Sequence, residues 1–184
     1  MATVTYLKAR QILDSRGTPT VEADMRLDTG DTCRASVPSG ASTGSYESIE
    51  LRDKDKNRFD GKGVLKAVEN INSLIAKEVK NKKFDSLNEF DSFLINLDGT
   101  ENKSRIGANA ILACSLAFLK CSAKNMDKEI YEFLNSSGTY ILPTPLMNII
   151  NGGAHANNGL DIQEFMIVPG GFDTFSESLR AGVE

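Results

Sequence analysis

Several residue types that often mark a function are scarce in this sequence. Its 184 residues contain no tryptophan, one histidine, three cysteines and five prolines. Cys33, Cys114 and Cys121 show none of the short spacings of a zinc site. Cys114 and Cys121 are separated by roughly 10 Å along the axis of a predicted helix, which is too far for a disulfide. An odd number of unpaired thiols favours a reducing, cytoplasmic location.

Long apolar runs and a strong excess of one charge are also missing. The uncharged apolar stretch at 106–119 is shorter than the roughly 20 residues that a membrane-spanning helix needs. The first residues lack the basic and apolar pattern of a signal peptide. A net charge of -4 gives no general attraction to nucleic acid or to an anionic membrane. We therefore expect no membrane span and no nucleic-acid partner.

The first third of the chain alternates apolar and polar residues with a period of two, which predicts an antiparallel sheet. Residues 20–27 and 32–37 form a hairpin, and residues 4–13 are expected to add a third strand. Apolar residues at helical spacing then predict helices over 64–79, 87–97, 106–119 and 130–134. Together these elements predict an α+β domain, with a three-stranded antiparallel meander followed by helices.

The character of the sequence changes near Gly138. Short apolar runs at 146–150 and 162–168 are typical of strands that are covered on both faces. Thr174, with a glutamate three residues later, predicts the start of a helix. We therefore expect one domain over residues 1–138 and the beginning of another over residues 139–184.

A loop of small residues follows the hairpin, and its hydroxyl and N–H groups could bind a phosphate or a hard cation. The loop consists of Ser39, Gly40, Ala41, Ser42, Thr43 and Gly44. It lacks the Lys-Ser or Lys-Thr of a P-loop, so its composition alone favours a flexible connection.

Three other places contain candidate functional side chains. His155 suits proton transfer or an anion contact, although its context alone favours a surface-loop histidine without a role. Glu164 interrupts an apolar strand, where a carboxylate is costly unless it is paired or bound to a cation. Because polar residues at strand ends of parallel barrels point into the active site, a functional Glu164 is favoured over a structural ion pair. Residues 14–22 fit a turn, and their charged and hydroxyl groups also fit an interface.

Six segments, in this order and spacing, resemble the enolase family along the whole chain. They are Asp14-Ser15-Arg16-Gly17 with Pro19-Thr20-Val21-Glu22, Val37-Pro38-Ser39-Gly40-Ala41-Ser42-Thr43-Gly44, Leu97-Asp98-Gly99-Thr100, Gly107-Ala108-Asn109-Ala110-Ile111, Asn151-Gly152-Gly153-Ala154-His155-Ala156 and Gln163-Glu164-Phe165-Met166. The resemblance implies an N-terminal α+β domain over 1–138. Residues 139–184 would then be the first strands of an enolase-type (β/α)8 barrel, which begins with two strands and two helices. It also implies a Mg²⁺-dependent lyase that reversibly dehydrates 2-phosphoglycerate to phosphoenolpyruvate in glycolysis and gluconeogenesis.

The resemblance assigns roles to individual residues of the active site. Ser42, in the mobile loop, would bind the second of two Mg²⁺ ions per active site. His155, Gln163 and Glu164 would contact the substrate. His155 and Glu164 would be catalytic, with Glu164 near the departing hydroxyl.

The resemblance also bears on partners and on activity. Arg16 and Glu22 would lie in the interface of a homodimer or a higher homo-oligomer. Family members are cytoplasmic, with an additional cell-surface or secreted pool in some cases. The family's base, principal catalytic glutamate and three metal-binding carboxylates lie further along than residue 184, so this chain alone is expected to be inactive. The alternatives are another lyase or isomerase of the wider superfamily and a non-catalytic surface-binding fragment.

Overall fold

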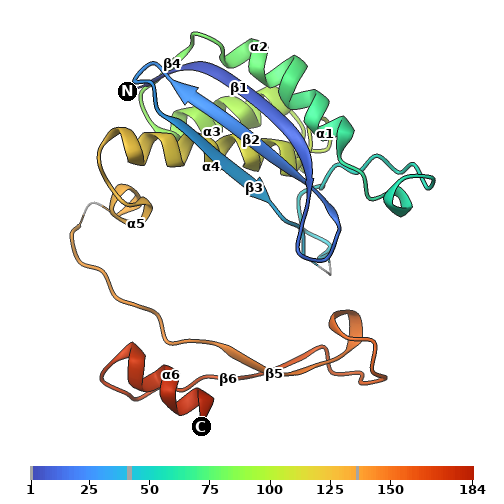
Figure 1. Ribbon diagram of the computed structural model, residues 1–184, viewed down its shortest axis with the longest axis vertical. Helices are drawn as coiled ribbons and strands as arrows, with labels where there is room; N and C mark the ends of the chain where they lie inside the picture. Colours follow the sequence, from blue (N-terminus) through green and yellow to red (C-terminus); the bar gives the residue numbers. More distant parts are fainter. Residues whose placement is uncertain (1, 41–42, 136) are drawn as a thin grey trace. The chain divides into compact units, whose positions relative to one another are not determined.

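The computed structural model describes residues 2–40, 43–135 and 137–184. The chain divides into two compact units. The first combines residues 1–39 with 45–136, and the second combines residues 40–44 with 137–184. Each unit has its own strands and helices (Figure 1).

The first unit is built on an antiparallel sheet with the strand order β3-β2-β1-β4. The strands are β1 (Ala2–Leu13), β2 (Pro19–Leu27), β3 (Thr32–Val37) and β4 (Lys83–Phe84). The predicted three-stranded meander is confirmed, and β4 extends it by pairing with Ala2 and Thr3. β4 was not predicted because two residues are too few to show a period.

Helices cover one face of this sheet (Figure 1). After the short turn η1 (Phe59–Gly61), residues 65–79 form one helical run that contains α1 (Leu65–Glu69), the π-helical η2 (Asn70–Ile75) and α2 (Ala76–Val79). The helices α3 (Leu87–Asp98), α4 (Ala108–Asn125) and α5 (Ile130–Leu134) follow. All four predicted helical segments are therefore present.

The π-helical turn provides a contact that ties the helical run to β1. The Asn72 side-chain oxygen accepts a hydrogen bond from the Ala9 N–H at 2.7 Å, and its amide donates to the Ala9 carbonyl at 3.1 Å. Ala9 lies on the edge of β1 that β4 covers only at Ala2 and Thr3. Asn72 thus satisfies backbone groups that would otherwise be open to pairing with another chain.

Helix α4 lies at the centre of the core. Ala110, Ala113 and Ala117 are fully buried, because small side chains let the helix pack closely on the sheet. Beside α4, Phe90 stacks on Phe118 with ring centroids 4.3 Å apart and meets Phe84 edge-on at 4.9 Å. Burying a large apolar side chain stabilises a fold by about 1.5–3 kcal/mol, so this unit has a substantial core of its own.

The second unit is a two-stranded ribbon followed by a helix. It contains β5 (Met147–Asn151), the short turn η3 (Gly153–His155), β6 (Glu164–Ile167) and α6 (Phe175–Val183), and β5 pairs antiparallel with β6. Both predicted strands are present. Thr174 accepts a hydrogen bond from the Glu177 N–H at 3.2 Å, which confirms the predicted helix start.

The two strands of the second unit are exposed in this chain, although their apolar runs are typical of strands that are covered on both faces. Ile149 of β5 is 55% exposed and Phe165 of β6 is 54% exposed. Among residues 137–184, all of which the structure describes, only Gly152 and Ser178 are buried. A single ribbon offers no second layer against which its apolar side chains can pack.

None of the helices that the structure describes combines the length and the apolar character needed to cross a membrane. The longest, α4, is buried inside the first unit.

Candidate active-site segments

The connection between β5 and β6 brings two distant segments of the sequence together. The Gly152 N–H donates to the Gln163 carbonyl at 3.0 Å, and the Gly153 N–H donates to the Leu160 carbonyl at 2.8 Å. Within the same connection, the Asn158 side chain donates to the Asn151 carbonyl at 2.8 Å. These bonds hold the His155 turn against the beginning of β6.

Gly152 allows this close approach because it has no side chain. A Cβ atom at this position would lie 2.4 Å from the Ile162 carbonyl oxygen and 2.7 Å from the Leu160 Cβ. Both distances are shorter than van der Waals contact, and the nearest atom belongs to the backbone, which cannot move aside easily. Any other residue at position 152 would therefore push the two segments apart.

The result is a cluster of His155, Gln163 and Glu164. The His155 Nδ1 lies 2.7 Å from the Glu164 Oε1, and the His155 Nε2 lies 3.2 Å from the Gln163 Nε2. A neutral imidazole satisfies both contacts if Nδ1–H donates to the carboxylate and Nε2 accepts from the Gln163 amide. The hydrogen bond to Glu164 fixes the tautomer and the orientation of the ring.

The cluster is open to solvent on one side. The His155 side chain is 24% exposed and the Glu164 side chain is 33% exposed. A ligand can therefore reach both groups. Proton exchange with a ligand suits this pair, because a carboxylate next to an imidazole can accept a proton and return it. If His155 becomes protonated, the Gln163 amide can rotate so that its oxygen accepts from Nε2–H.

The loop of residues 39–44 begins at a firmly held position. The Ser39 carbonyl accepts a hydrogen bond from Arg16 Nη2 at 2.7 Å, and the Ser39 hydroxyl accepts from Arg52 Nη2 at 2.9 Å. Gly40, Thr43 and Gly44 are exposed. Ala41 and Ser42 lie outside the described residues.

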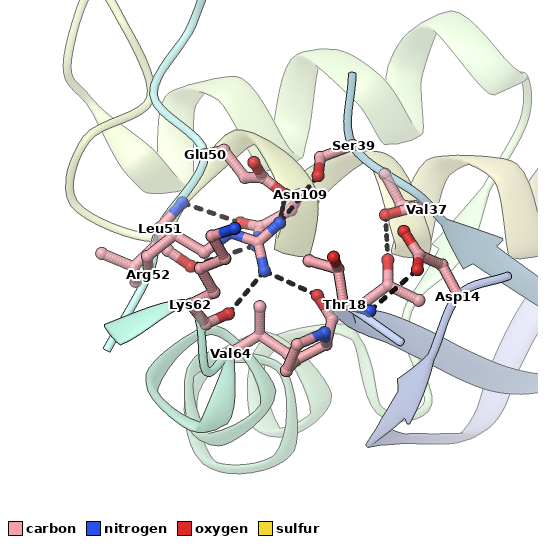
Figure 2. A network of polar contacts seen from close by, with 12 residues as sticks. Asp14, Thr18, Val37, Ser39, Glu50, Leu51, Arg52, Lys62, Val64 and Asn109 are labelled. Carbon is pink, nitrogen blue, oxygen red and sulfur yellow. Dashed lines mark hydrogen bonds and ion pairs between the residues drawn. The ribbon is translucent and has the colours of Figure 1, made fainter. Parts of the chain in front are cut away.

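Arg52 connects this position to three other segments, as Figure 2 shows. Its guanidinium donates to the carbonyls of Pro19 and Lys62, each at 2.6 Å, and to the Glu50 carboxylate at 2.6 Å. The side chain is only 16% exposed. The sequence did not predict a role for Arg52, because Arg52 lies in no recognisable motif and its neighbours show no pattern typical of a site.

Arg16 and Glu22, the two candidate interface residues, make separate contacts within the chain. Besides Ser39, Arg16 lies 3.5 Å from the Asp14 carboxylate. Glu22 accepts from Arg10 at 2.5 Å and from the Ser36 hydroxyl at 2.8 Å. Glu22 therefore belongs to a network of charges that crosses the sheet.

Asp24 completes this charge network on the sheet. Arg34 donates to Asp24 at 2.7 Å, and Arg10 forms a second ion pair with it. The hydrogen bonds from Arg34 and then Arg10 lower the pKa of Asp24 to about 2, although burial opposes the shift. Asp24 is consequently ionised at any physiological pH.

The described side chains include carboxylates and hydroxyls, which are candidate metal ligands. Among residues 2–40, 43–135 and 137–184, no group of three or more histidine, cysteine, aspartate or glutamate side chains is placed to hold a metal ion. Glu164 is engaged with His155, and a neutral hydroxyl such as Ser39 is a weak ligand by itself.

The comparisons with known proteins agree with this architecture. The family model described as the enolase N-terminal domain matches residues 4–134. The chain belongs to the enolase family. The model of the enolase C-terminal TIM barrel domain matches residues 139–184.

A curated relative within the enolase family has a similar sequence. Enolase 1 of Chlorobaculum tepidum is 55% identical over 178 residues, which cover 97% of this chain and 42% of that protein. The chain thus spans less than half the length of the curated relative it matches. The α+β fold followed by the beginning of the barrel domain is the fold that the enolase match implies.

Proposed function

We propose that the protein of which these 184 residues form a part is an enolase, a lyase that reversibly dehydrates 2-phosphoglycerate to phosphoenolpyruvate. In this proposal it acts in the cytoplasm, in glycolysis and gluconeogenesis. Membership of the enolase family supports the reaction class. The observation that carries the assignment to this chain is the cluster of His155, Gln163 and Glu164.

The proposed chemistry requires a proton on the departing hydroxyl of the substrate. In our proposal, Glu164 stands near this hydroxyl, and the His155 Nδ1–H fixes the carboxylate through their 2.7 Å contact. Gln163 holds the other ring nitrogen, and all three side chains contact the substrate. To act as a general acid, Glu164 carries its proton on the oxygen that does not accept from His155, and this proton passes to the leaving hydroxyl, which departs as water.

The proposed enzyme uses two Mg²⁺ ions per active site, and Ser42 of the loop at residues 39–44 binds the second ion. The family's base and main metal ligands lie further along than residue 184, so the chain alone is predicted to have no turnover. We also propose that the boundary between the two domains lies at residues 138–139. Arg16 and Glu22 are proposed to lie in the interface of a homodimer or a higher homo-oligomer.

The substitution Glu164→Gln in the full-length enzyme tests the catalytic assignment. We expect formation of phosphoenolpyruvate to fall by on the order of 10²-fold or more, because a positioned proton donor is lost. Exchange of the substrate's α-proton with deuterated solvent should fall much less, since that step precedes loss of the hydroxyl. Glu177→Gln is the matched control, because Glu177 binds Arg180 on the exposed helix α6.

Equal loss of both steps would remove Glu164 from the leaving-group role. Absence of any activity of the wild-type full-length enzyme on 2-phosphoglycerate would instead contradict the reaction and favour another member of the superfamily. For the 184-residue chain, the assay is Mg²⁺-dependent formation of phosphoenolpyruvate, and turnover above background, with host enolase excluded, would contradict the predicted inactivity.

A further inference from the structure

Two cysteines that are far apart in the sequence meet beneath the sheet edge of the first unit. Cys33 lies on β3, directly opposite Met25 of β2. Cys121 lies on α4, and its Sγ donates to the Met25 carbonyl at 3.3 Å, with the Asp31 carbonyl 3.7 Å away. Met25 is the strand partner of Cys33, and Asp31 precedes Cys33 by two residues, so the Cys121 thiol contacts the backbone immediately around Cys33. Cys33 and Cys121 are therefore neighbours in space, and both thiols are free in this structure.

The two thiols differ in their access to solvent. Cys121 is buried, whereas Cys33 is half-buried and lines an open cleft of about 510 Å³. Helices α4 and α5 form the remaining wall of the cleft, with Lys120 and Lys124 among its residues. A small molecule in the cleft can touch Cys33 without any movement of the core.

We propose that Cys33 and Cys121 are a dithiol modification site, which a hydroperoxide converts into a reversible intramolecular disulfide. In the first step the Cys33 sulfur attacks the peroxide, its O–O bond breaks, and Cys33 sulfenic acid and an alcohol or water form. In the second step the Cys121 sulfur attacks the sulfenic sulfur and releases water. The two thiols together lose two electrons and two protons, and the peroxide is reduced by two electrons.

The buried partner makes the second step the slower one. Burial, and then the neighbouring Cys33 thiol, raise the pKa of Cys121 to about 12, so the Cys121 sulfur remains protonated at neutral pH. Since thiolates are the reactive species, sulfenic acid at Cys33 should form first and be trapped in competition with the disulfide.

Cys114 provides an internal comparison. It lies on the same helix as Cys121 but is fully buried, and burial alone raises its pKa. It does not line the cleft beside Cys33. Cys114 should therefore stay reduced under conditions that oxidise the other two.

Mass spectrometry of the peroxide-treated chain tests the proposal. The folded monomer is treated with hydrogen peroxide and then unfolded in denaturant, so that all its free thiols are alkylated, and it is digested without reductant. We expect the peptides containing Cys33 and Cys121 to be linked, Cys114 to be alkylated, and the link to disappear with dithiothreitol. The covalent link between β3 and α4 should also raise the Tm of the first unit by about 5 °C or more, because it closes a long loop.

Three single substitutions complete the test. Cys121→Ser should leave Cys33 sulfenic acid, detected as its dimedone adduct, and abolish the increase in Tm. Cys33→Ser should abolish both products, and Cys114→Ser should preserve the disulfide. Three results in the wild-type chain would each overturn the proposal. They are oxidation of Cys33 to sulfinic or sulfonic acid while Cys121 stays a free thiol that is alkylated, a disulfide to Cys114, and disulfides between chains only. If Cys121→Ser does not fold, the wild-type peptide map alone decides between these results.

Discussion

Strand β2 of the first unit and strand β6 of the second carry similar apolar side chains, but they bury them very differently. Val21, Ala23 and Met25 of β2 have no exposed surface, whereas Phe165 and Met166 of β6 are 54% and 41% exposed. The helices of the first unit supply the second layer that β2 needs. The sequence of a segment can therefore determine that it forms a strand, while the stability of that strand depends on a second layer that packs against it.

A pair of phenylalanine substitutions gives the largest expected contrast between the units. Phe90→Ala should lower the free energy of unfolding of the first unit by about 3–5 kcal/mol, because it leaves a cavity beside Phe84 and Phe118. Phe165→Ala is the matched substitution in the second unit and should change this free energy by less than about 0.5 kcal/mol. Urea unfolding followed by circular dichroism measures both.

A comparable loss from both phenylalanine variants would show that the two units unfold as one. A small loss from Phe90→Ala would show that the aromatic cluster contributes less than its burial indicates.

The free energy of unfolding of the first unit should depend on acidic pH through Asp24, whereas an exposed aspartate of the second unit should have no such effect. Because the pKa of Asp24 is lowered from 3.8 to about 2 in the folded chain, the carboxylate stabilises the fold above about pH 4. This contribution is lost as the pH falls from about 4 to 2. Asp24→Asn should therefore cost about 1–2 kcal/mol at pH 7 and almost nothing near pH 2.

The measurement for Asp24 is the free energy of unfolding of the first unit as a function of pH. Asp173→Asn, at an exposed aspartate of the second unit, is the control and should leave this curve unchanged. A constant difference between wild type and Asp24→Asn from pH 2 to 7 would contradict the assigned role of the ion pairs.

The helix caps offer the smallest and most closely matched contrast. Ser86 accepts from the Glu89 N–H at 3.1 Å in the first unit, and Thr174 accepts from the Glu177 N–H at 3.2 Å in the second. Ser86→Ala should destabilise the first unit by about 1 kcal/mol, because an orphan N–H loses its partner. Thr174→Ala should reduce only the helicity of α6, which amide chemical shifts can follow. An equal effect of both caps on the main unfolding transition would mean that α6 belongs to the same cooperative unit.

Much of the fold could be predicted from the sequence, because its elements have local signals. The alternation in β2 and β3 and the apolar spacing of α4 are confirmed. The π-helical turn was not predicted, because apolar spacing does not distinguish it from an α-helix, and its Asn72 contacts Ala9, which lies far away in the sequence. The exposure of β5 and β6 cannot be read from their apolar runs, because such a run indicates what a strand can bury and not whether a layer covers it.

The candidate site was only partly predictable. The resemblance to the enolase family singled out His155 and Glu164, but no spacing rule places an imidazole 2.7 Å from that carboxylate. Gly152 permits the contact and stood in a quoted motif without a stated role. The meeting of Cys33 with Cys121 was missed, because only spacings along one helix were considered and this pair joins a strand to a helix.

Hydrogen exchange of the monomeric 184-residue chain, read by mass spectrometry, tests most directly the claim that only the first unit has a stabilising core. Amides of β2 and α4 should exchange only on global unfolding, while those of β5 and β6 should exchange close to the rates of an unstructured chain. The amides of His155 and Glu164 are the decisive ones, because they lie in the second unit and belong to the candidate site. Protection of these two amides equal to that of α4 would contradict the account.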